Sequence, residues 1–150
     1  MDHLTLLGHL DNEQHGGRSF RSTLSQLLEQ NDWVVDSLCS GSNVELLYLY
    51  FAKAFDLIDI SILLTKLKKS NVTGKLLHWI RSFLMNRSQH VRVGNSLSNL
   101  RRVCLGVPQG SILGPILFLA YIADLQMEDN CKTMSKLSKY AKDSKVLTRT

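Results

Sequence analysis

The sequence has few of the features that mark secreted or membrane-spanning chains. Its three cysteines, Cys39, Cys104 and Cys131, lie far apart and form no CxxC pair. This argues against a disulfide framework and predicts buried free thiols. The longest apolar run, from Ile112 to Ala123, is shorter than the roughly 20 residues that a membrane span needs. No basic and apolar leader opens the chain, so we expect an intracellular protein that spans no membrane.

Several catalytic and metal-binding patterns are also missing. The five histidines show no HExxH or Cys/His spacing, so the sequence predicts no zinc site. It contains no GxxxxGK[ST] or GxSxG string, which argues against P-loop and α/β-hydrolase chemistry. What is present is 44% hydrophobic residues over 150 positions, enough for a buried core, and a net charge of +5. That charge favours anionic partners without specifying one.

Both prolines, Pro108 and Pro115, fall in one stretch, which leaves the rest of the chain free to form regular structure. Hydrophobic spacing and capping residues predict an α+β domain. Its first helix is expected to begin at Ser22 or Thr23 and to carry a regular row of leucines and valines. Helices are expected at about 24–38, 60–67, 76–84 and 115–125, a buried strand at 44–51, and hairpin strands near 89–93, 100–105, 137–141 and 145–148.

Three strings follow one another along the chain: YLYFAKAFD at 48–56, GVPQGSILGP at 106–115 and YAKD at 140–143. They resemble the three palm motifs of reverse transcriptases, most closely those of non-LTR retrotransposons of the LINE or jockey type. The resemblance extends from about residue 11 to about residue 147. It implies a partial fingers–palm fold with an antiparallel palm sheet and helices packed on one face. Residues 1–42 would be a fingers remnant and residues 43–150 the palm, with the thumb and endonuclease absent and apolar surface left uncovered.

The resemblance implies template-directed DNA synthesis from an RNA template, a DNA primer and deoxynucleoside triphosphates, with Mg²⁺ as cofactor. Such transfer uses two metal ions about 3.5–4 Å apart, and Mg²⁺ prefers carboxylate oxygens. The family's ligand aspartates match Tyr50, Lys142 and Asp143, so only Asp143 remains a carboxylate. Aspartates at the other two positions would lower the net charge from +5 to +2, because one lysine would be lost and two acids gained. We therefore expect a catalytically inactive polymerase fold with at most weak metal binding at Asp143.

Asp56 and Asp59 are the nearest other carboxylates to the lost ligand at position 50. Neither matches a ligand position of the family. Capping of the following helix accounts for both without a metal, although a shifted registration that makes one of them a ligand stays open.

Other positions keep the family's residues. Phe55 matches the bulky residue that excludes the ribose 2′ hydroxyl, with an ordinary core phenylalanine as the alternative. Pro108, Gln109 and Gly110 match the loop that lies against nucleotide and template, with a plain turn before a helix as the alternative.

Arg18 and Arg21 match family arginines that contact triphosphate or nucleic acid, although solvated surface arginines would look the same. Gly17 and Phe20 look exchanged relative to the family order, which places an aromatic residue where a flexible glycine is expected.

Two further hypotheses stay open beside the inactive polymerase. One is a non-catalytic nucleic-acid-binding module that uses the basic charge, to which Arg87, Arg92, Arg101 and Arg102 contribute. The other is residual polymerase activity through a re-formed site. If Tyr50, Lys142 and Asp143 converge on adjacent strands, the palm interpretation is supported.

Overall fold

The computed structural model describes residues 13–126 and 135–150. These residues form two compact units, and each is treated separately below. The sheet unit comprises the described residues up to Ala52 and from Ile122 onward, and the helical unit comprises Lys53–Tyr121. The mixture of helices and antiparallel strands confirms the predicted α+β class. The expected boundary between fingers and palm at residue 42 stays a prediction.

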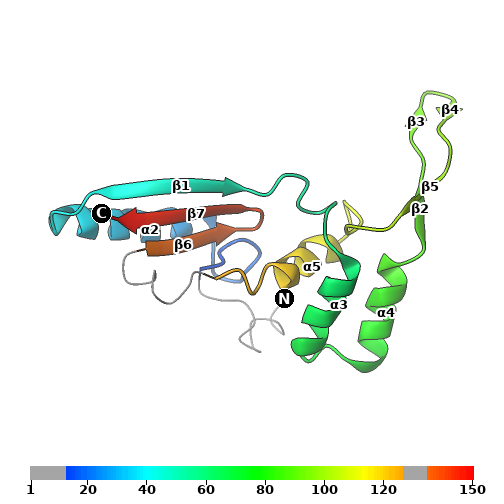
Figure 1. The fold of residues 1–150 in the computed structure, drawn as a ribbon, viewed down its shortest axis with the longest axis horizontal. Coiled ribbons are helices and arrows are strands. Elements are labelled where there is room, and N and C mark those ends of the chain that lie inside the picture. The colour runs from blue at the N-terminus through cyan, green and yellow to red at the C-terminus, as the bar shows by residue number, and fades with distance from the viewer. Residues whose placement is uncertain (1–12, 127–134) are drawn as a thin grey trace. The chain divides into compact units, whose positions relative to one another are not determined.

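In the sheet unit, three antiparallel strands lie in the order β1 (Val44–Tyr50), β7 (Asp143–Arg149) and β6 (Ser135–Tyr140) (Figure 1). All seven residues of β1 pair with β7, from Val44 opposite Arg149 to Tyr50 opposite Asp143. The last two strands are longer than predicted, so that the hairpin turn contains only Ala141 and Lys142. Asp143 is therefore the first residue of β7, and strand pairing places it on the same side of the sheet as Tyr50.

Helix α2 (Thr23–Cys39) packs against one face of this sheet. Ser22 caps it, as predicted, in a reciprocal capping box with Ser25. The predicted helix is confirmed, but most of its leucine and valine row is exposed. Leu24, Leu27, Leu28, Val35 and Leu38 are 47–64% exposed, whereas the buried side chains are Gln26, Gln30 and Ser37. The buried face is polar because both glutamine amides donate to the hydroxyl of Ser138 on β6.

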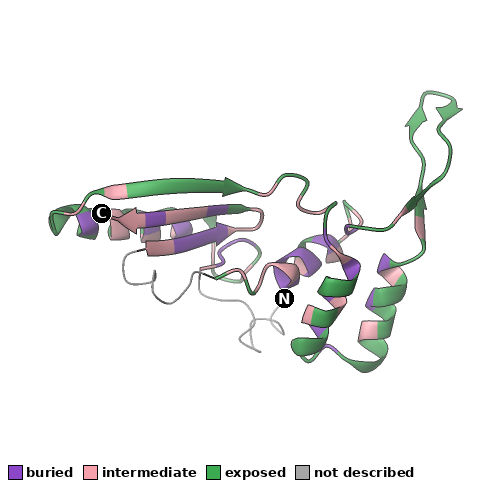
Figure 2. Cartoon of the chain, viewed as in Figure 1, coloured by how far each residue is buried: buried purple, intermediate pink, exposed green. Residues whose placement is uncertain are grey.

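The apolar run of β1 was predicted to be a buried strand, and this was wrong. Residues 45–50 are exposed, with Val44 half-buried, and Figure 2 shows β1 green along nearly its whole length. Among the described residues β1 is an edge strand that pairs only with β7, and most of its side chains are left without a covering layer. Apolar surface is thus left uncovered on this strand, as expected from the sequence.

The helical unit carries most of the buried apolar side chains. Asp59 caps α3 (Ile60–Lys69) by accepting from the amides of Ser61 and Ile62 at 2.8 and 3.0 Å. Helix α3 contacts both α4 (Gly74–Leu84) and α5 (Leu113–Tyr121). The apolar core that results contains Ile58, Ile60, Leu63, Leu67, Val72, Ile80, Leu84, Val107, Leu117, Phe118, Leu119 and Ala120. Helix α5 ends at Tyr121, four residues before the predicted end.

A long hairpin connects α4 to α5. Its base pairs β2 (Arg87–Gln89) with β5 (Arg101–Val103), and its tip pairs β3 (Arg92–Val93) with β4 (Ser96–Leu97). The predicted hairpin is confirmed, with Gly94 in the turn at a φ of 59°.

The two cysteines in the described part of the chain were predicted to be buried. Cys39 and Cys104 are instead exposed. Both lie just at the end of an element, Cys39 as the last residue of α2 and Cys104 directly after β5, where no layer covers them. Cys131 lies outside the described residues. No described helix has both the length and the apolar character that crossing a bilayer requires.

Candidate nucleotidyl-transfer site

The three residues at the expected ligand positions lie together in the sheet unit. Tyr50 ends β1 and stands opposite Asp143, the first residue of β7. Lys142 occupies the preceding turn, and its Nζ donates a hydrogen bond of 3.0 Å to the hydroxyl of Tyr50. The same ammonium lies 4.8 Å from the centroid of the Tyr50 ring. These positions thus meet at one end of the sheet.

The donor set at this tip does not fit a pair of magnesium ions. Asp143 is the single carboxylate, and Tyr50 and Lys142 contribute a phenol and an ammonium. The hydrogen bond and electrostatic interaction with Tyr50 and the nearby Asp143 raise the pKa of Lys142, so the ammonium stays charged at neutral pH. Within residues 13–126 and 135–150, no cluster of three His, Cys, Asp or Glu side chains is suited to a metal ion. The chemistry available at the tip is that of a cation beside a carboxylate.

The family residues of the first and second strings meet in the helical unit. Val107 N donates to Phe55 O at 2.8 Å, and Gly106 N donates to Ile58 O at 2.8 Å. These two bonds tie the segment before Pro108 to the segment that contains Phe55. A cavity of about 390 Å³ lies between Phe55 and residues 108–112, with Gly114 and Pro115 completing its wall. The backbone thereby brings Phe55, Pro108, Gln109 and Gly110 together as predicted, while their roles toward nucleotide stay predictions.

Phe55 combines a core contact with a position on the cavity wall. Its ring lies 4.9 Å from that of Phe118, centroid to centroid, at an interplanar angle of 44°. This is an ordinary tilted aromatic pair. Because the side chain is only half-buried, it still contributes to the cavity.

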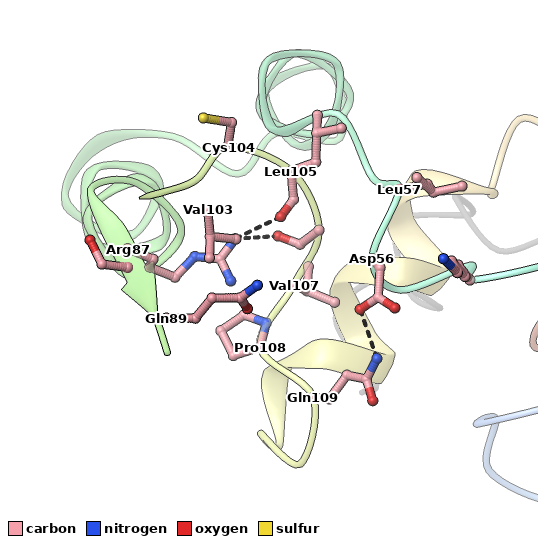
Figure 3. Close-up of a pocket in the computed structure, with 13 residues that line it drawn as sticks. Asp56, Leu57, Arg87, Gln89, Val103, Cys104, Leu105, Val107, Pro108 and Gln109 are labelled. Carbon is pink, nitrogen blue, oxygen red and sulfur yellow. Dashed lines mark hydrogen bonds between the residues drawn. The ribbon is translucent and has the colours of Figure 1, made fainter. Parts of the chain in front are cut away.

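Gln109 has a partner that sequence reasoning did not identify. Its Nε2 donates to Asp56 Oδ1 at 2.7 Å (Figure 3). A carboxylate only accepts hydrogen bonds, so this contact fixes the amide with Oε1 directed away from Asp56. The capping role predicted for Asp59 is confirmed, whereas Asp56 serves to hold Gln109.

In the sequence, Arg87 was identified only as one of the basic residues. In the structure it holds the backbone that leads into the loop at residues 108–110. Its guanidinium donates to the carbonyl oxygens of Leu84, Leu105 and Gly106. Burial lowers the pKa of this guanidinium from its usual high value. Figure 3 shows Arg87 on the wall of a second cavity, of about 910 Å³, which also includes Asp56 and Gln109. No local pattern signalled this role, because the bonds to residues 105 and 106 span 18 and 19 positions.

The predicted arginines of the first segment lie near the start of α2. Arg21 forms an ion pair with Glu29, whose carboxylate also lies 3.4 Å from His15 Nε2 and 3.9 Å from Lys136 Nζ. Arg21 is therefore engaged within the sheet unit, and Arg18 is half-buried. Burial lowers the pKa of His15, because desolvation outweighs the nearby Glu29 charge.

The exchanged residues beside these arginines both have positive φ. Phe20 has a φ of 61° and Gly17 a φ of 72°. Phe20 therefore adopts a left-handed conformation that favours glycine, at the position where the family order has one.

Comparison with known proteins finds relatives among RNA-directed DNA polymerases. The sequence model described as "Reverse transcriptase (RNA-dependent DNA polymerase)" matches residues 2–150. The chain is 31% identical over 144 residues to the probable RNA-directed DNA polymerase from transposon BS of Drosophila melanogaster, covering 92% of this chain and 16% of that protein. It is 29% identical over 140 residues to the RNA-directed DNA polymerase from mobile element jockey of the same organism, covering 91% and 15%.

A solved structure described as a partial Cas6-RT-Cas1–Cas2 complex matches with a TM-score of 0.39 and 23% identity, covering 87% of this chain and 21% of that one. The chain spans about one-sixth of the length of the Drosophila relatives. The match of the family model over nearly the whole sequence, together with the ordered motifs, shows that this chain belongs to the reverse transcriptase (RNA-dependent DNA polymerase) family.

Proposed function

We propose that this chain is a retrotransposon-type reverse transcriptase segment that does not catalyse nucleotidyl transfer. The observation that supports this most directly is the hydrogen bond of 3.0 Å between Lys142 Nζ and the Tyr50 hydroxyl. It occupies the end of β1 and β7, where the family's ligand aspartates would stand. A charged ammonium there repels a divalent cation and leaves Asp143 as the only carboxylate of the three positions.

The energetic consequence for catalysis is large. A bound metal supplies several kcal/mol of transition-state stabilisation, and each 1.36 kcal/mol corresponds to a factor of ten in rate. Loss of two ligand positions therefore predicts that the rate of nucleotidyl transfer falls by at least several orders of magnitude. No step of DNA synthesis is assigned to the present residues.

Metal binding tests the proposal without depending on catalysis. We expect that Mn²⁺ titration, followed by electron paramagnetic resonance, detects no specific site in the natural chain. The double variant Tyr50→Asp/Lys142→Asp should bind Mn²⁺, since it restores three neighbouring carboxylates. Tyr50→Asn/Lys142→Asn is the matched control, because it has nearly the same side-chain size without the charge.

Primer extension on an RNA template provides the second measurement. The natural chain should give no product above a control without protein. Extension that Asp143→Ala abolishes would show that the site works as it stands, and the proposal would be wrong.

A second candidate function, nucleic-acid binding without catalysis, is favoured by cations beside exposed aromatic rings on the sheet. Lys142 and Lys145 lie over the rings of Tyr50 and Tyr48, respectively. The net charge of +5 has the appropriate sign. Binding to an RNA–DNA primer–template duplex across a salt series should give a negative slope of log K against log salt. Absence of binding at low salt to this duplex and to a single strand would exclude this candidate.

A further inference from the structure

The sheet unit presents two tyrosines and two lysines on one face, at the open edge of the sheet. We call Tyr48, Tyr50, Lys142 and Lys145 the aromatic–cation ladder. Tyr48 and Tyr50 are 66% and 64% exposed. Both belong to β1, the edge strand that lies beside β7 in Figure 1. Large aromatic side chains with this exposure, in a row on an edge strand, are an unusual feature for a protein surface.

Strand register places the ladder residues on a common face. Tyr48 pairs with Lys145, and Tyr50 pairs with Asp143 next to the Lys142 turn. Paired residues of antiparallel strands point to the same side, and alternate residues of one strand do so too. Tyr48 and Tyr50 are therefore about 6.8 Å apart along the strand, since each residue advances about 3.4 Å. That separation is about twice the stacking distance of bases and suits an extended single strand.

One lysine lies over the ring of each tyrosine. Lys142 Nζ lies 4.8 Å from the centroid of the Tyr50 ring, and Lys145 Nζ lies 5.4 Å from that of Tyr48. Farther along the same face of β7, Arg149 lies 4.9 Å from the ring of Trp33. The cations thus follow one line along β7, with Asp143 as the only carboxylate on this face of the strand.

Helix α2 packs on this face beneath β6 and β7 and also contacts β1. Its contacts reach Ser138, Lys145 and Arg149 through Gln30 and Ser37. The rings of Tyr48 and Tyr50 remain open to solvent, as their exposure shows. Internal cation–π pairing at exposed sites contributes only about 0.5–1 kcal/mol. That pairing leaves about two-thirds of each side chain in water, available to a ligand with flat apolar surfaces and negative charge.

We propose that the aromatic–cation ladder binds single-stranded nucleic acid, with bases stacked on Tyr48 and Tyr50 and phosphates paired with Lys142 and Lys145. The chemistry is complementary on both counts, because every base has a π face and every linkage a negative charge. In a duplex the base faces are already stacked on one another, so the single strand is the preferred ligand. This proposal rests on the nucleic-acid-binding candidate described above and specifies its surface and its mode.

The test measures binding of the intact chain to fluorescein-labelled dT12 and to a blunt 12-base-pair duplex by fluorescence anisotropy. We expect tighter binding of dT12. Tyr48→Thr and Tyr50→Thr remove the ring and introduce threonine, a β-branched residue suited to a strand. Each should weaken dT12 binding by about 5- to 150-fold, the range for loss of one base–aromatic stack, and should leave the salt slope unchanged.

The lysines should produce a different signature. Lys142→Gln/Lys145→Gln should reduce the slope of log K against log salt by about 1.4, since each single-strand phosphate contact contributes about 0.7. Lys68→Gln/Lys69→Gln on α3 removes the same charge elsewhere and should leave the slope nearly unchanged. Trp79→Leu, which removes a ring that is 54% exposed on α4, is the matched control for the tyrosine variants.

The outcomes separate this proposal from the function on which it rests. Failure of the natural chain to bind either probe at low salt overturns both. Binding that persists undiminished in folded Tyr48→Thr and Tyr50→Thr variants, or equal affinity for duplex and dT12, overturns the ladder alone. Far-ultraviolet circular dichroism reports whether each variant is folded. If the tyrosine variants do not fold, an unchanged salt slope in the lysine double variant still refutes the proposal.

Discussion

Replacement of Gly106 by alanine should destabilise the helical unit far more than replacement of Gly110. Both glycines have a left-handed backbone, with φ of 78° and 76°. A Cβ at position 106 would lie 2.7 Å from three backbone atoms: Cα and O of Asp56, and O of Phe55. At position 110 it would meet nothing within 4 Å. The pair thus separates backbone strain from steric overlap.

The magnitudes follow from these contacts. A left-handed alanine costs about 1–2 kcal/mol at either position. At Gly106, relief of the overlap requires separation of two backbone segments joined by the bonds Gly106 N to Ile58 O and Val107 N to Phe55 O. Each such bond contributes about 0.5–1.5 kcal/mol net, and overpacking adds about 1–3 kcal/mol. The loss of unfolding free energy in Gly106→Ala should therefore exceed that in Gly110→Ala by about 2–6 kcal/mol.

Urea unfolding followed by tryptophan fluorescence provides the assay. The chain has two tryptophans, Trp33 and Trp79, and Trp79 lies in the helical unit. In a Trp33→Phe background, Trp79 reports that unit specifically. With a urea dependence of about 1 kcal/mol per molar, the midpoint of Gly106→Ala should lie at least about 2 M below that of Gly110→Ala. Coincident midpoints would refute the steric overlap at position 106 and leave only the cost of the left-handed backbone, which both variants share.

Two further predictions concern the sheet unit. Burial lowers the pKa of His15 below its ordinary 6.5, so the unfolded chain binds more protons between these two pKa values. Stability present above pH 6.5 should therefore be lost as the pH falls toward the folded value. In His15→Gln, the unfolding free energy should decrease less between pH 7.5 and pH 5 than in the natural chain. An equal decrease in the variant would show that His15 is not the group responsible. Phe20 is fully exposed with φ of 61°, so Phe20→Gly should be about 1 kcal/mol more stable than Phe20→Ala in thermal unfolding. Equal stability of the two variants would contradict a strained backbone there.

Local chemistry made much of the fold predictable. The N-caps Ser22 and Asp59 act on amides two or three residues away, so a short sequence window contains both partners. The order of the three family strings also anticipated that Tyr50, Lys142 and Asp143 would meet, and strand pairing brings them together. In each case the deciding information lies in adjacent residues or in motif order.

Contacts between distant residues were not predictable in this way. Gln109 and Asp56 are 53 positions apart, and nothing near either one indicates the other. Burial of the Val44–Tyr50 run also depends on distant residues, because a strand is buried only where other layers cover it. Its apolar composition predicted the strand correctly and its environment wrongly.

The orientation of α2 shows why periodicity alone could not settle which face is buried. The leucine row and the glutamine row are both spaced for one face of a helix, and hydrophobicity favours burial of the leucines. The structure buries the glutamines because a single acceptor, Ser138 Oγ, takes hydrogen bonds of 2.9 and 2.8 Å from Gln26 and Gln30. Burial of an amide costs little once it is paired, and a great deal when it is not. The partner lies more than 100 residues away, so the pairing that decides the helix face is invisible in the helix itself.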